Sequence, residues 1–315
     1  MRRVISSVAV VVVLAASAAC GAPTSGGAST SGGATQPTAS ASASFPVTVE
    51  AANGTVTIGS RPSRIVSLSP TITEMLFAVG ADDQVEAVDE FSTFPDEAPV
   101  TELSGFEPNL EAVVSYAPDL VVLDTDAGRV VAGLAAVGVT TLLLPAARSL
   151  DETYAQIELV GTATGHAQEA AGVTKDMRQE IDSILAASPA EGPASVYHEL
   201  DDTYYSVTSE TFIGQVYRMF GLSNIADEAK GAGSGYPQLS SEYIVQSDPD
   251  VIVLADGECC GITPEKVASR PGWADISAVR SASVIAIDDD IASRWGPRIV
   301  EFIRTVGEEL AGVSG

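Results

Sequence analysis

Apolar runs and amphipathic stretches alternate along the chain, and this order predicts strands followed by helices. An apolar run at residues 64–68 leads into an amphipathic helix that ends at Gly80. The same order recurs with a run near residues 195–197 and a helix that Thr211 begins. Continuous apolar runs are typical of strands buried on both faces, and strands that alternate with helices favour parallel sheets with right-handed crossovers. The pattern therefore predicts an α/β protein.

Two segments of the chain repeat one another. In residues 108–124, Glu111 stands seven residues before a Pro-Asp pair, and an unbroken aliphatic run follows. Residues 237–256 have the same arrangement around Glu242. Because proline favours extended backbone in the residue before it, each Pro-Asp pair predicts a turn into a buried strand. Two similar halves, each with one acidic residue at an equivalent place, predict two lobes with a cleft between them.

A helical stretch separates the two repeats. Ser149 and Glu152 form a capping-box pattern that begins a helix, and Gly161 weakens its continuation beyond about Val160. A second helix is predicted at residues 167–187, whose 21 positions span roughly 30 Å. A single rigid helix between two lobes permits little hinge motion, so we expect the lobes to close only slightly on a ligand.

The N-terminus has the features of a bacterial lipoprotein signal. Arg2 and Arg3 precede an apolar stretch of 16 residues, which is short of the roughly 20 that a spanning helix needs. Small residues stand directly before Cys20, which resembles a lipobox and predicts that Cys20 carries lipid. An ordinary secretory signal with an incidental cysteine is the alternative. Residues 21–45 consist mostly of Gly, Ala, Ser, Thr, Pro and Gln, and they predict a flexible tether.

The length of 315 residues accommodates two domains of ordinary size. The expected fold is α/β with two lobes, each with a central, mostly parallel sheet flanked by helices, joined by one long inter-lobe helix. The predicted organisation is a signal segment at residues 1–20, a tether at 21–45, an N-terminal lobe at 46–165, an inter-lobe helix at 166–188 and a C-terminal lobe at 193–315.

The chain is strongly acidic, with 42 Asp and Glu against 16 Lys and Arg and a net charge of −26. This charge repels nucleic-acid phosphates, so nucleic acid is not an expected partner. The chain has only two histidines and no Gly-x-Ser-x-Gly or Gly-x-x-x-x-Gly-Lys motif, which disfavours both an enzyme and a transition-metal carrier. His198 ends a predicted strand and is interpreted as structural. A cell-surface hydrolase or an adhesion protein is the alternative of a different class.

Cys259 and Cys260 are adjacent and follow the predicted strand at residues 251–254. They therefore lie at the carboxyl edge of a sheet, where open α/β sheets bind their ligands. In an oxidising compartment we expect a disulfide between them. Free thiols or a metal–thiolate contact remain alternatives.

Aromatic residues make up only 6% of the chain, yet they gather in loops at strand ends. Phe91, Phe106, Tyr205 and Tyr236 have such positions. Exposed aromatic rings at strand ends suit a large, flat and partly apolar ligand. Local loop packing is the alternative, and we favour it for Phe94 and for one of the two adjacent tyrosines.

These features resemble the substrate-binding proteins of ABC importers that handle cobalamin, haem and ferric siderophores. The resemblance spans about residues 60–312. It rests on the two glutamate segments and on residues 290–298, which read Asp-Ile-Ala-Ser-Arg-Trp-Gly-Pro-Arg. It is strongest for the cobalamin-binding branch. The resemblance implies two α/β lobes joined by a long helix, with the ligand between them.

The resemblance also implies roles for individual residues. Glu111 and Glu242, one in each lobe, would dock onto arginines of a dimeric permease, because guanidinium groups bind carboxylates bidentately. An alternative is two surface glutamates that suit the dipoles of their helices. A salt bridge between Asp290 and Arg294 without a ligand role is likewise an alternative. The implied ligand-binding residues are Phe91, Phe106, Tyr205, Tyr236, Asp290 and Arg294.

We therefore expect a monomeric, lipid-anchored receptor on the outer face of the cell membrane. It has no catalytic residues, no metal site and no permanently bound cofactor. Its expected cargo is cobalamin, which it delivers to an ABC permease; a ferric siderophore or haem is the alternative. Haem would need an axial ligand such as Tyr205 or His198.

Overall fold

The computed structural model describes residues 44–188 and 194–313. The predicted signal segment with Cys20, and nearly all of the predicted tether, lie outside the described residues. Residues 42–315 form one compact unit. Of the helices in the two described ranges, none combines the length and apolar character needed to cross a bilayer. The predicted boundaries between the lobes and their connecting helix stay predictions.

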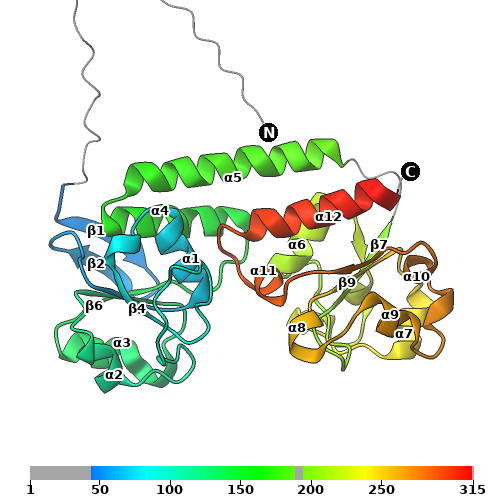
Figure 1. The fold of residues 1–315 in the computed structure, drawn as a ribbon, viewed down its shortest axis with the longest axis horizontal. Coiled ribbons are helices and arrows are strands. Elements are labelled where there is room, and N and C mark those ends of the chain that lie inside the picture. The colour runs from blue at the N-terminus through cyan, green and yellow to red at the C-terminus, as the bar shows by residue number, and fades with distance from the viewer. Residues whose placement is uncertain (1–43, 189–193, 314–315) are drawn as a thin grey trace, which may run out of the picture. The chain divides into compact units, whose positions relative to one another are not determined.

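Two four-stranded parallel sheets form the framework of this unit (Figure 1). Their strand orders are β4-β3-β5-β6 and β10-β9-β7-β8. When the strands of each sheet are numbered in chain order, both sheets have the same spatial order: second, first, third, fourth. The strands are β3 (Ile65–Leu68), β4 (Val85–Val88), β5 (Leu120–Leu123), β6 (Thr140–Leu143), β7 (Ser195–Glu199), β8 (Ser223–Asn224), β9 (Val251–Leu254) and β10 (Val284–Ala286). The predicted α/β fold class is confirmed, and the internal repeat of the sequence is a repeat of topology.

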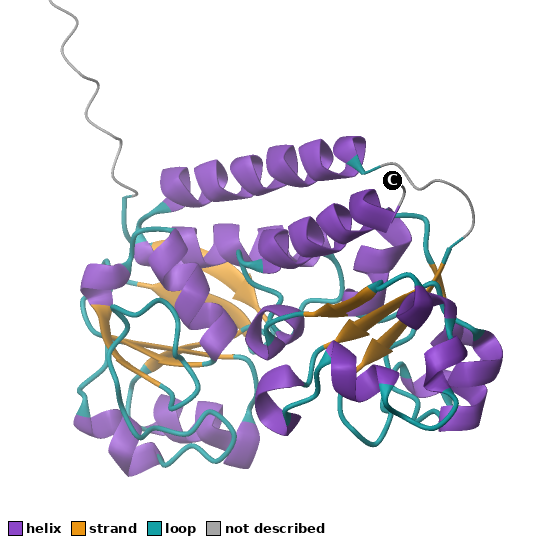
Figure 2. Ribbon diagram, turned by 45° about the vertical axis from the view of Figure 1, so that its right-hand side comes forward, coloured by secondary structure: helices purple, strands orange, loops and turns teal. Residues whose placement is uncertain are grey.

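Helices cover both faces of the sheets (Figure 2). An antiparallel hairpin of β1 (Val47–Ala51) and β2 (Gly54–Ile58) precedes the first sheet. The sequence pattern did not predict this hairpin, nor the short strands β4 and β8. The helices are α1 (Pro70–Ala78), α2 (Leu110–Ser115), α3 (Val130–Ala136), α4 (Leu150–Thr164), α5 (Ala167–Ala187), α6 (Phe212–Met219), α7 (Ser241–Ser247), α8 (Gly257–Cys260), α9 (Pro264–Ala268), α10 (Ser277–Arg280), α11 (Asp289–Ser293) and α12 (Ile299–Val313).

The two Pro-Asp pairs anchor neighbouring strands in the same way. Asp119 accepts hydrogen bonds from the backbone N–H and the hydroxyl of Ser63, at 2.8 and 2.9 Å, just before β3. Asp250 accepts the equivalent pair from Ser195 at the start of β7, at 2.8 and 3.0 Å. The residue before each proline has a positive φ, 49° at Ala117 and 45° at Asp248, where extended backbone was expected. The physical reason is that each of these residues ends a helix in the left-handed turn common at helix C-termini.

Helix α5 has the bounds predicted for the second helix, residues 167–187, and it lies against α4 near one end and α12 near the other (Figure 1). Helix α4 does not weaken near Val160 as expected, but continues through Gly161 to Thr164. The reason is a close helix contact: a Cβ at Gly161 would lie 2.3 Å from the Cβ of Ala170 on α5. Glycine at this position lets the two helices touch.

The second contact of α5 uses another glycine. A Cβ at Gly307 of α12 would lie 2.9 Å from Cγ2 of Ile184, and the Ser188 hydroxyl donates to the Gly307 carbonyl at 2.9 Å. We call the part built around β3 to β6 the first half and the part built around β7 to β10 the second half. One continuous apolar cluster includes Ile72 from the first half and Phe302 from the second. The joined core explains why both sheets belong to one compact unit.

The α4–α5 contact gives a test of this packing. Gly161→Ala should lower the free energy of unfolding by about 1–3 kcal/mol, because the added methyl group overlaps Ala170. The matched control is Gly172→Ala on α5, where a Cβ meets nothing within 4 Å. That control should stabilise the protein by up to about 1 kcal/mol, since alanine is the better helix former. Urea denaturation of both variants measures the difference, and equal effects would contradict the packing argument.

Candidate functional site

The predicted ligand residues lie on segments that follow the carboxyl ends of parallel strands: the four aromatic residues are on loops, and Asp290 is on the short helix α11 after β10. In each sheet the strand order reverses between the first and third strands, β3 and β5 in one and β7 and β9 in the other. Open α/β sheets bind ligands outside the carboxyl ends of their strands, at such reversals. Each half of the protein therefore has its own candidate ligand-binding edge.

On the first half, Phe91 and Phe106 form a pair of exposed rings. Their centroids are 5.5 Å apart in an edge-to-face arrangement, and the residues are 48% and 74% exposed. The loop beneath them is held by buried polar groups, in which the Ser92 hydroxyl bonds to Asp89 and to Thr73. Burial raises the pKa of Asp89, although its hydrogen bond with Ser92 opposes the shift. The rings are thus exposed apolar groups on a fixed loop.

On the second half, Tyr205 and Tyr236 lie on adjacent segments. The Ser206 N–H donates to the Pro237 carbonyl at 2.9 Å, and the two tyrosines are 40% and 50% exposed. Tyr204 instead stacks on Trp273, with ring centroids 5.8 Å apart. The expectation that one of the adjacent tyrosines packs locally therefore fits Tyr204 and leaves Tyr205 exposed.

Arg294 joins the two halves. Its guanidinium lies 2.7 Å from Glu74 of α1 and 2.5 Å from Asp290, and it donates to the Phe91 carbonyl at 3.1 Å. Arg294 is only 6% exposed, and Glu74 is 3% exposed. Burial raises the pKa of Glu74, even though the bond from Arg294 and the charges of Arg294 and Arg298 lower it. The expected Asp290–Arg294 contact is present, and Glu74 is a partner that sequence reasoning missed.

Glu74 was within reach of the sequence pattern, because it stands beside Met75 in the predicted apolar stripe of α1. Its partner Arg294, which lies 220 positions later in the chain, could not be identified from the sequence. Asp290 is the accessible member of the group, with a side chain 43% exposed, and the Thr93 hydroxyl donates to it at 3.3 Å. The ligand roles of Asp290 and Arg294 stay predictions.

A second buried charge cluster lies at the strand reversal of the other sheet. Arg270 donates to both carboxylate oxygens of Glu199 at 2.6 and 2.5 Å, and the Tyr197 hydroxyl donates to the same carboxylate at 3.1 Å. Asp256 follows β9 and is completely buried. Burial, and after it the negative charge of Glu199, raises the pKa of Asp256 to about 7. Neither carboxylate oxygen of Asp256 has a hydrogen-bond partner, so the buried group favours its neutral, protonated form.

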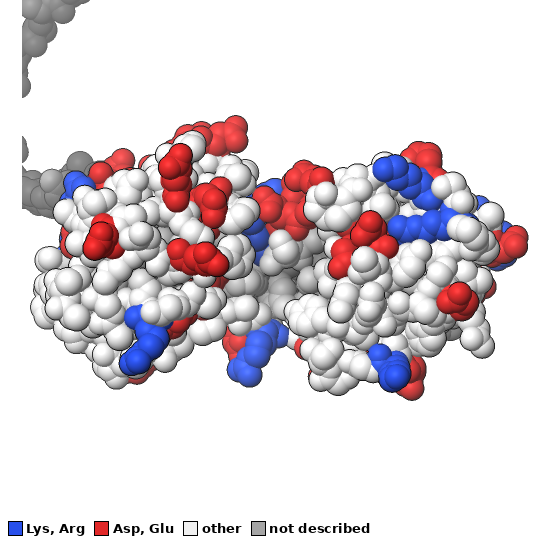
Figure 3. Space-filling view, turned by 90° about the horizontal axis from the view of Figure 1, so that it is seen from below, with Lys and Arg blue, Asp and Glu red and all other residues white. Residues whose placement is uncertain are grey.

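Glu111 and Glu242 occupy equivalent positions in their halves. Each is exposed and lies in the first turn of a short helix, α2 or α7, that a side-chain cap begins. Both helices lie at the lower edge of the molecule in Figure 1. Figure 3 shows the face seen from below, which is hollowed between the two halves and has acidic side chains on both. The docking role of the two glutamates stays a prediction.

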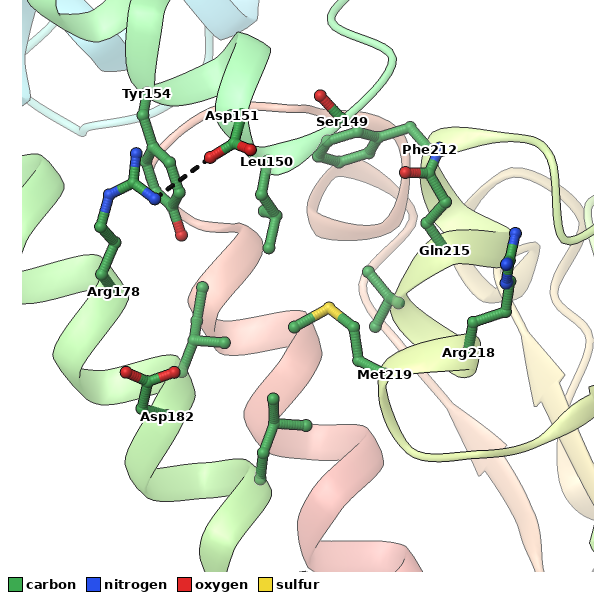
Figure 4. A pocket seen from close by; sticks show the side chains of 13 residues that line it. Ser149, Leu150, Asp151, Tyr154, Arg178, Asp182, Phe212, Gln215, Arg218 and Met219 are labelled. Carbon is green, nitrogen blue, oxygen red and sulfur yellow. Dashed lines mark hydrogen bonds and ion pairs between the residues drawn. The ribbon is translucent and has the colours of Figure 1, made fainter.

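A cavity of about 700 Å³ lies elsewhere, among α4, α5 and α6 (Figure 4). Arg178 borders it, stacked over the Tyr154 ring at 3.8 Å and paired with Asp151 at 3.1 Å. Figure 4 shows Leu150, Phe212 and Met219 directed into the space between the helices. The described residues that line this cavity include none of the predicted ligand-binding residues.

His198 is a core residue, in agreement with the structural interpretation. It is completely buried, and its Nδ1 lies 2.5 Å from the Tyr217 hydroxyl. Burial lowers its pKa to about 3, so the ring stays neutral. A side chain enclosed in this way is not available as an axial ligand for haem. Within residues 44–188 and 194–313, no group of three or more His, Cys, Asp or Glu side chains is arranged to hold a metal ion.

The buried pair between the halves should matter far more than an exposed one. Glu74→Gln removes a partner of the buried Arg294 and should lower the free energy of unfolding by about 3–5 kcal/mol. Glu210→Gln is the matched control, because its pair with Arg218 is exposed and should contribute less than about 1 kcal/mol. Urea denaturation compares the two. A loss at Glu74 no larger than at Glu210 would show that the buried pair does not hold the halves together.

The raised pKa of Asp256 predicts that the stability of the protein depends on pH. Its pKa in the folded protein is about 7 against an ordinary 3.8, so the folded state retains a proton that the unfolded chain has released. Stability should therefore fall as the pH rises from about 4 to about 7, by at most roughly 1.4 kcal/mol per pH unit from this group. Asp256→Asn should flatten that decline in thermal melts, whereas Asn at the exposed Asp202 should not. An unchanged slope in Asp256→Asn would contradict the raised pKa of Asp256.

Comparison with known proteins agrees with this geometry. Residues 65–291 match the family described as "Periplasmic binding protein". A Bacillus subtilis protein named "Uncharacterized ABC transporter substrate-binding lipoprotein YvrC" is 32% identical over 277 residues, which cover 84% of this chain and 86% of that protein. A Halobacterium salinarum protein named "Cobalamin-binding protein" is 34% identical over 268 residues, covering 82% of this chain and 72% of that protein.

A solved structure has the same fold. The apo form of the periplasmic heme-binding protein RhuT from Roseiflexus sp. RS-1 matches with a TM-score of 0.69 and 25% identity, covering 80% of this chain and 99% of that one. These matches confirm the two-lobed fold and the resemblance to substrate-binding proteins of ABC importers. The family transports substrates rather than transforming them. The chain belongs to the periplasmic binding protein family of substrate-binding proteins.

Proposed function

We propose that this protein binds cobalamin, or a related corrinoid, between its two halves and delivers it to an ABC permease. The observation that carries the proposal is the pair of exposed aromatic surfaces, Phe91 with Phe106 on one half and Tyr205 with Tyr236 on the other. Rings on both sides of a cleft suit a broad, flat macrocycle. The side chains of a corrin are neutral amides, which a chain with a net charge of −26 repels less than an anionic siderophore.

The cobalamin assignment draws further support from the Halobacterium relative, whose name gives cobalamin as its ligand. Asp290 stands at the boundary between the halves with an accessible carboxylate, and the proposal gives it a polar contact with the ligand. Arg294 is enclosed by Glu74 and Asp290, so its proposed contribution is to orient Asp290. Haem is the second candidate, because the structural neighbour from Roseiflexus is named for heme. Tyr205 is then the exposed side chain suited to haem iron.

The proposed place of action is the outer face of the cell membrane. Cys20 would carry the lipid, and residues 21–45 would tether the folded part to it. One relative is named a substrate-binding lipoprotein, which supports this placement. We propose that the protein acts there as a monomer.

Calorimetric titration with cyanocobalamin, haemin and a panel of ferric siderophores tests the ligand. The proposal predicts saturable binding of cyanocobalamin and weaker binding of the others. Phe106→Ala should weaken cyanocobalamin binding at least tenfold, about 1.4 kcal/mol, because it removes a ring that is 74% exposed in the free protein. Val100→Ala is a control at a fully exposed residue. Binding of haemin without cyanocobalamin would assign the site to haem instead.

Charge reversal tests the docking residues. Glu111→Lys and Glu242→Lys should each abolish cobalamin uptake by cells that depend on this protein, because a lysine repels the arginines proposed on the permease. Cobalamin affinity of the purified variants should not change. Glu169→Lys is the matched control, since Glu169 is also an exposed acid in the first turn of a helix. Normal uptake by both variants, or a loss of affinity in either, would refute the docking role.

A further inference from the structure

The turn that carries Cys259 and Cys260 lies at the strand reversal of the second sheet. β7 and β9 are neighbours there, with β8 beyond β7 and β10 beyond β9. The residues directly after β9 therefore occupy the edge at which open α/β sheets bind ligands. The loop after β7 carries Tyr205, one of the proposed ligand residues, and leaves the same edge.

The turn is held at both ends. Asp289 accepts hydrogen bonds from the backbone N–H groups of Gly257, Glu258 and Cys259, at 3.1, 3.2 and 3.0 Å. At the other end, the Lys266 ammonium donates to the Gly261 carbonyl at 2.6 Å. A disulfide joins Cys259 to Cys260, and both residues are exposed. The two sulfur atoms thus have fixed positions on the surface, which lowers the entropy lost when a ligand binds.

The turn lies on the side of the second half that faces the first. Figures 1 and 2 both show α8 on that side, next to α11. The hydrogen bonds agree with this view: Asp289 holds the turn, and the next residue, Asp290, accepts from Thr93 of the first half. Thr93 belongs to the same loop as Phe91. The disulfide therefore lies close to the boundary across which the two halves meet.

A disulfide between neighbouring residues presents two polarisable sulfur atoms and no strong hydrogen-bond donor. Sulfur makes favourable contacts with conjugated rings. We propose that the Cys259–Cys260 disulfide contacts the conjugated macrocycle of the transported ligand, as a contact of the second half in addition to Tyr205 and Tyr236. This inference rests on the proposed function and adds a contact that the aromatic pattern did not contain.

Protection from reduction tests the contact in the unmodified protein. The full chain is treated with dithiothreitol and iodoacetamide, with and without saturating cyanocobalamin, and mass spectrometry follows the peptide that contains Cys259 and Cys260. A ligand seated on the sulfur atoms should slow their reduction at least fivefold. Oxidised glutathione in the same tube controls for reductant consumed by the ligand. Equal rates with and without cyanocobalamin would overturn the inference.

The double substitution Cys259→Ser, Cys260→Ser measures what the contact contributes. Calorimetry should show cyanocobalamin binding at least tenfold weaker, with a thermal melt that confirms folding. Glu265→Ser in the neighbouring helix α9 is the control and should bind as the unmodified protein does. If the unmodified protein binds cyanocobalamin and the double variant binds it equally well, the inference fails while the proposed function stands. If the unmodified protein does not bind cyanocobalamin, the proposed function fails, and the inference fails with it.

Discussion

A buried guanidinium requires carboxylates around it, because the protein interior solvates a permanent charge poorly. Arg294 meets this requirement with Glu74 from the first half of the chain and Asp290 from its own half. Removing Glu74 leaves the buried guanidinium with one carboxylate and one carbonyl as partners, so the pair with Glu74 favours one relative position of the two halves. Helix α5, in contact with α4 through Gly161 and with α12 through Gly307, constrains the same position through close packing.

Two halves held in this way can present rigid ligand surfaces. The exposed rings Phe91 and Phe106 rest on a loop whose carbonyl at Phe91 is itself bound by Arg294. The charge that joins the halves therefore also positions a proposed ligand surface. A preformed site loses little conformational entropy on binding, which suits a receptor that must hold a dilute cargo and then release it to a transporter. If the proposed ligand surface is correct, stability and recognition depend on the same few side chains.

Much of the fold could be read from the sequence, because buried parallel strands are continuous apolar runs and the Pro-Asp segments mark the repeat. The end of α4 was mispredicted, since Gly161 weakens a helix locally and the compensating contact with Ala170 is tertiary. The short strand β8 has two residues and no periodicity to detect. In the candidate site, exposed aromatics were visible as loop residues. The pairing of Glu74 with Arg294 was not, because an acid beside an apolar stripe identifies its partner only once the halves are assembled.

We propose that the halves are already in their ligand-binding arrangement before the ligand arrives. Small-angle X-ray scattering of the protein with and without saturating cyanocobalamin tests it most directly. We expect radii of gyration that agree within about 1 Å, because the backbone of preorganised complexes moves by about 1 Å or less on binding. A large compaction on binding would contradict it, because the Glu74–Arg294 pair and the α5 contacts would then have to rearrange.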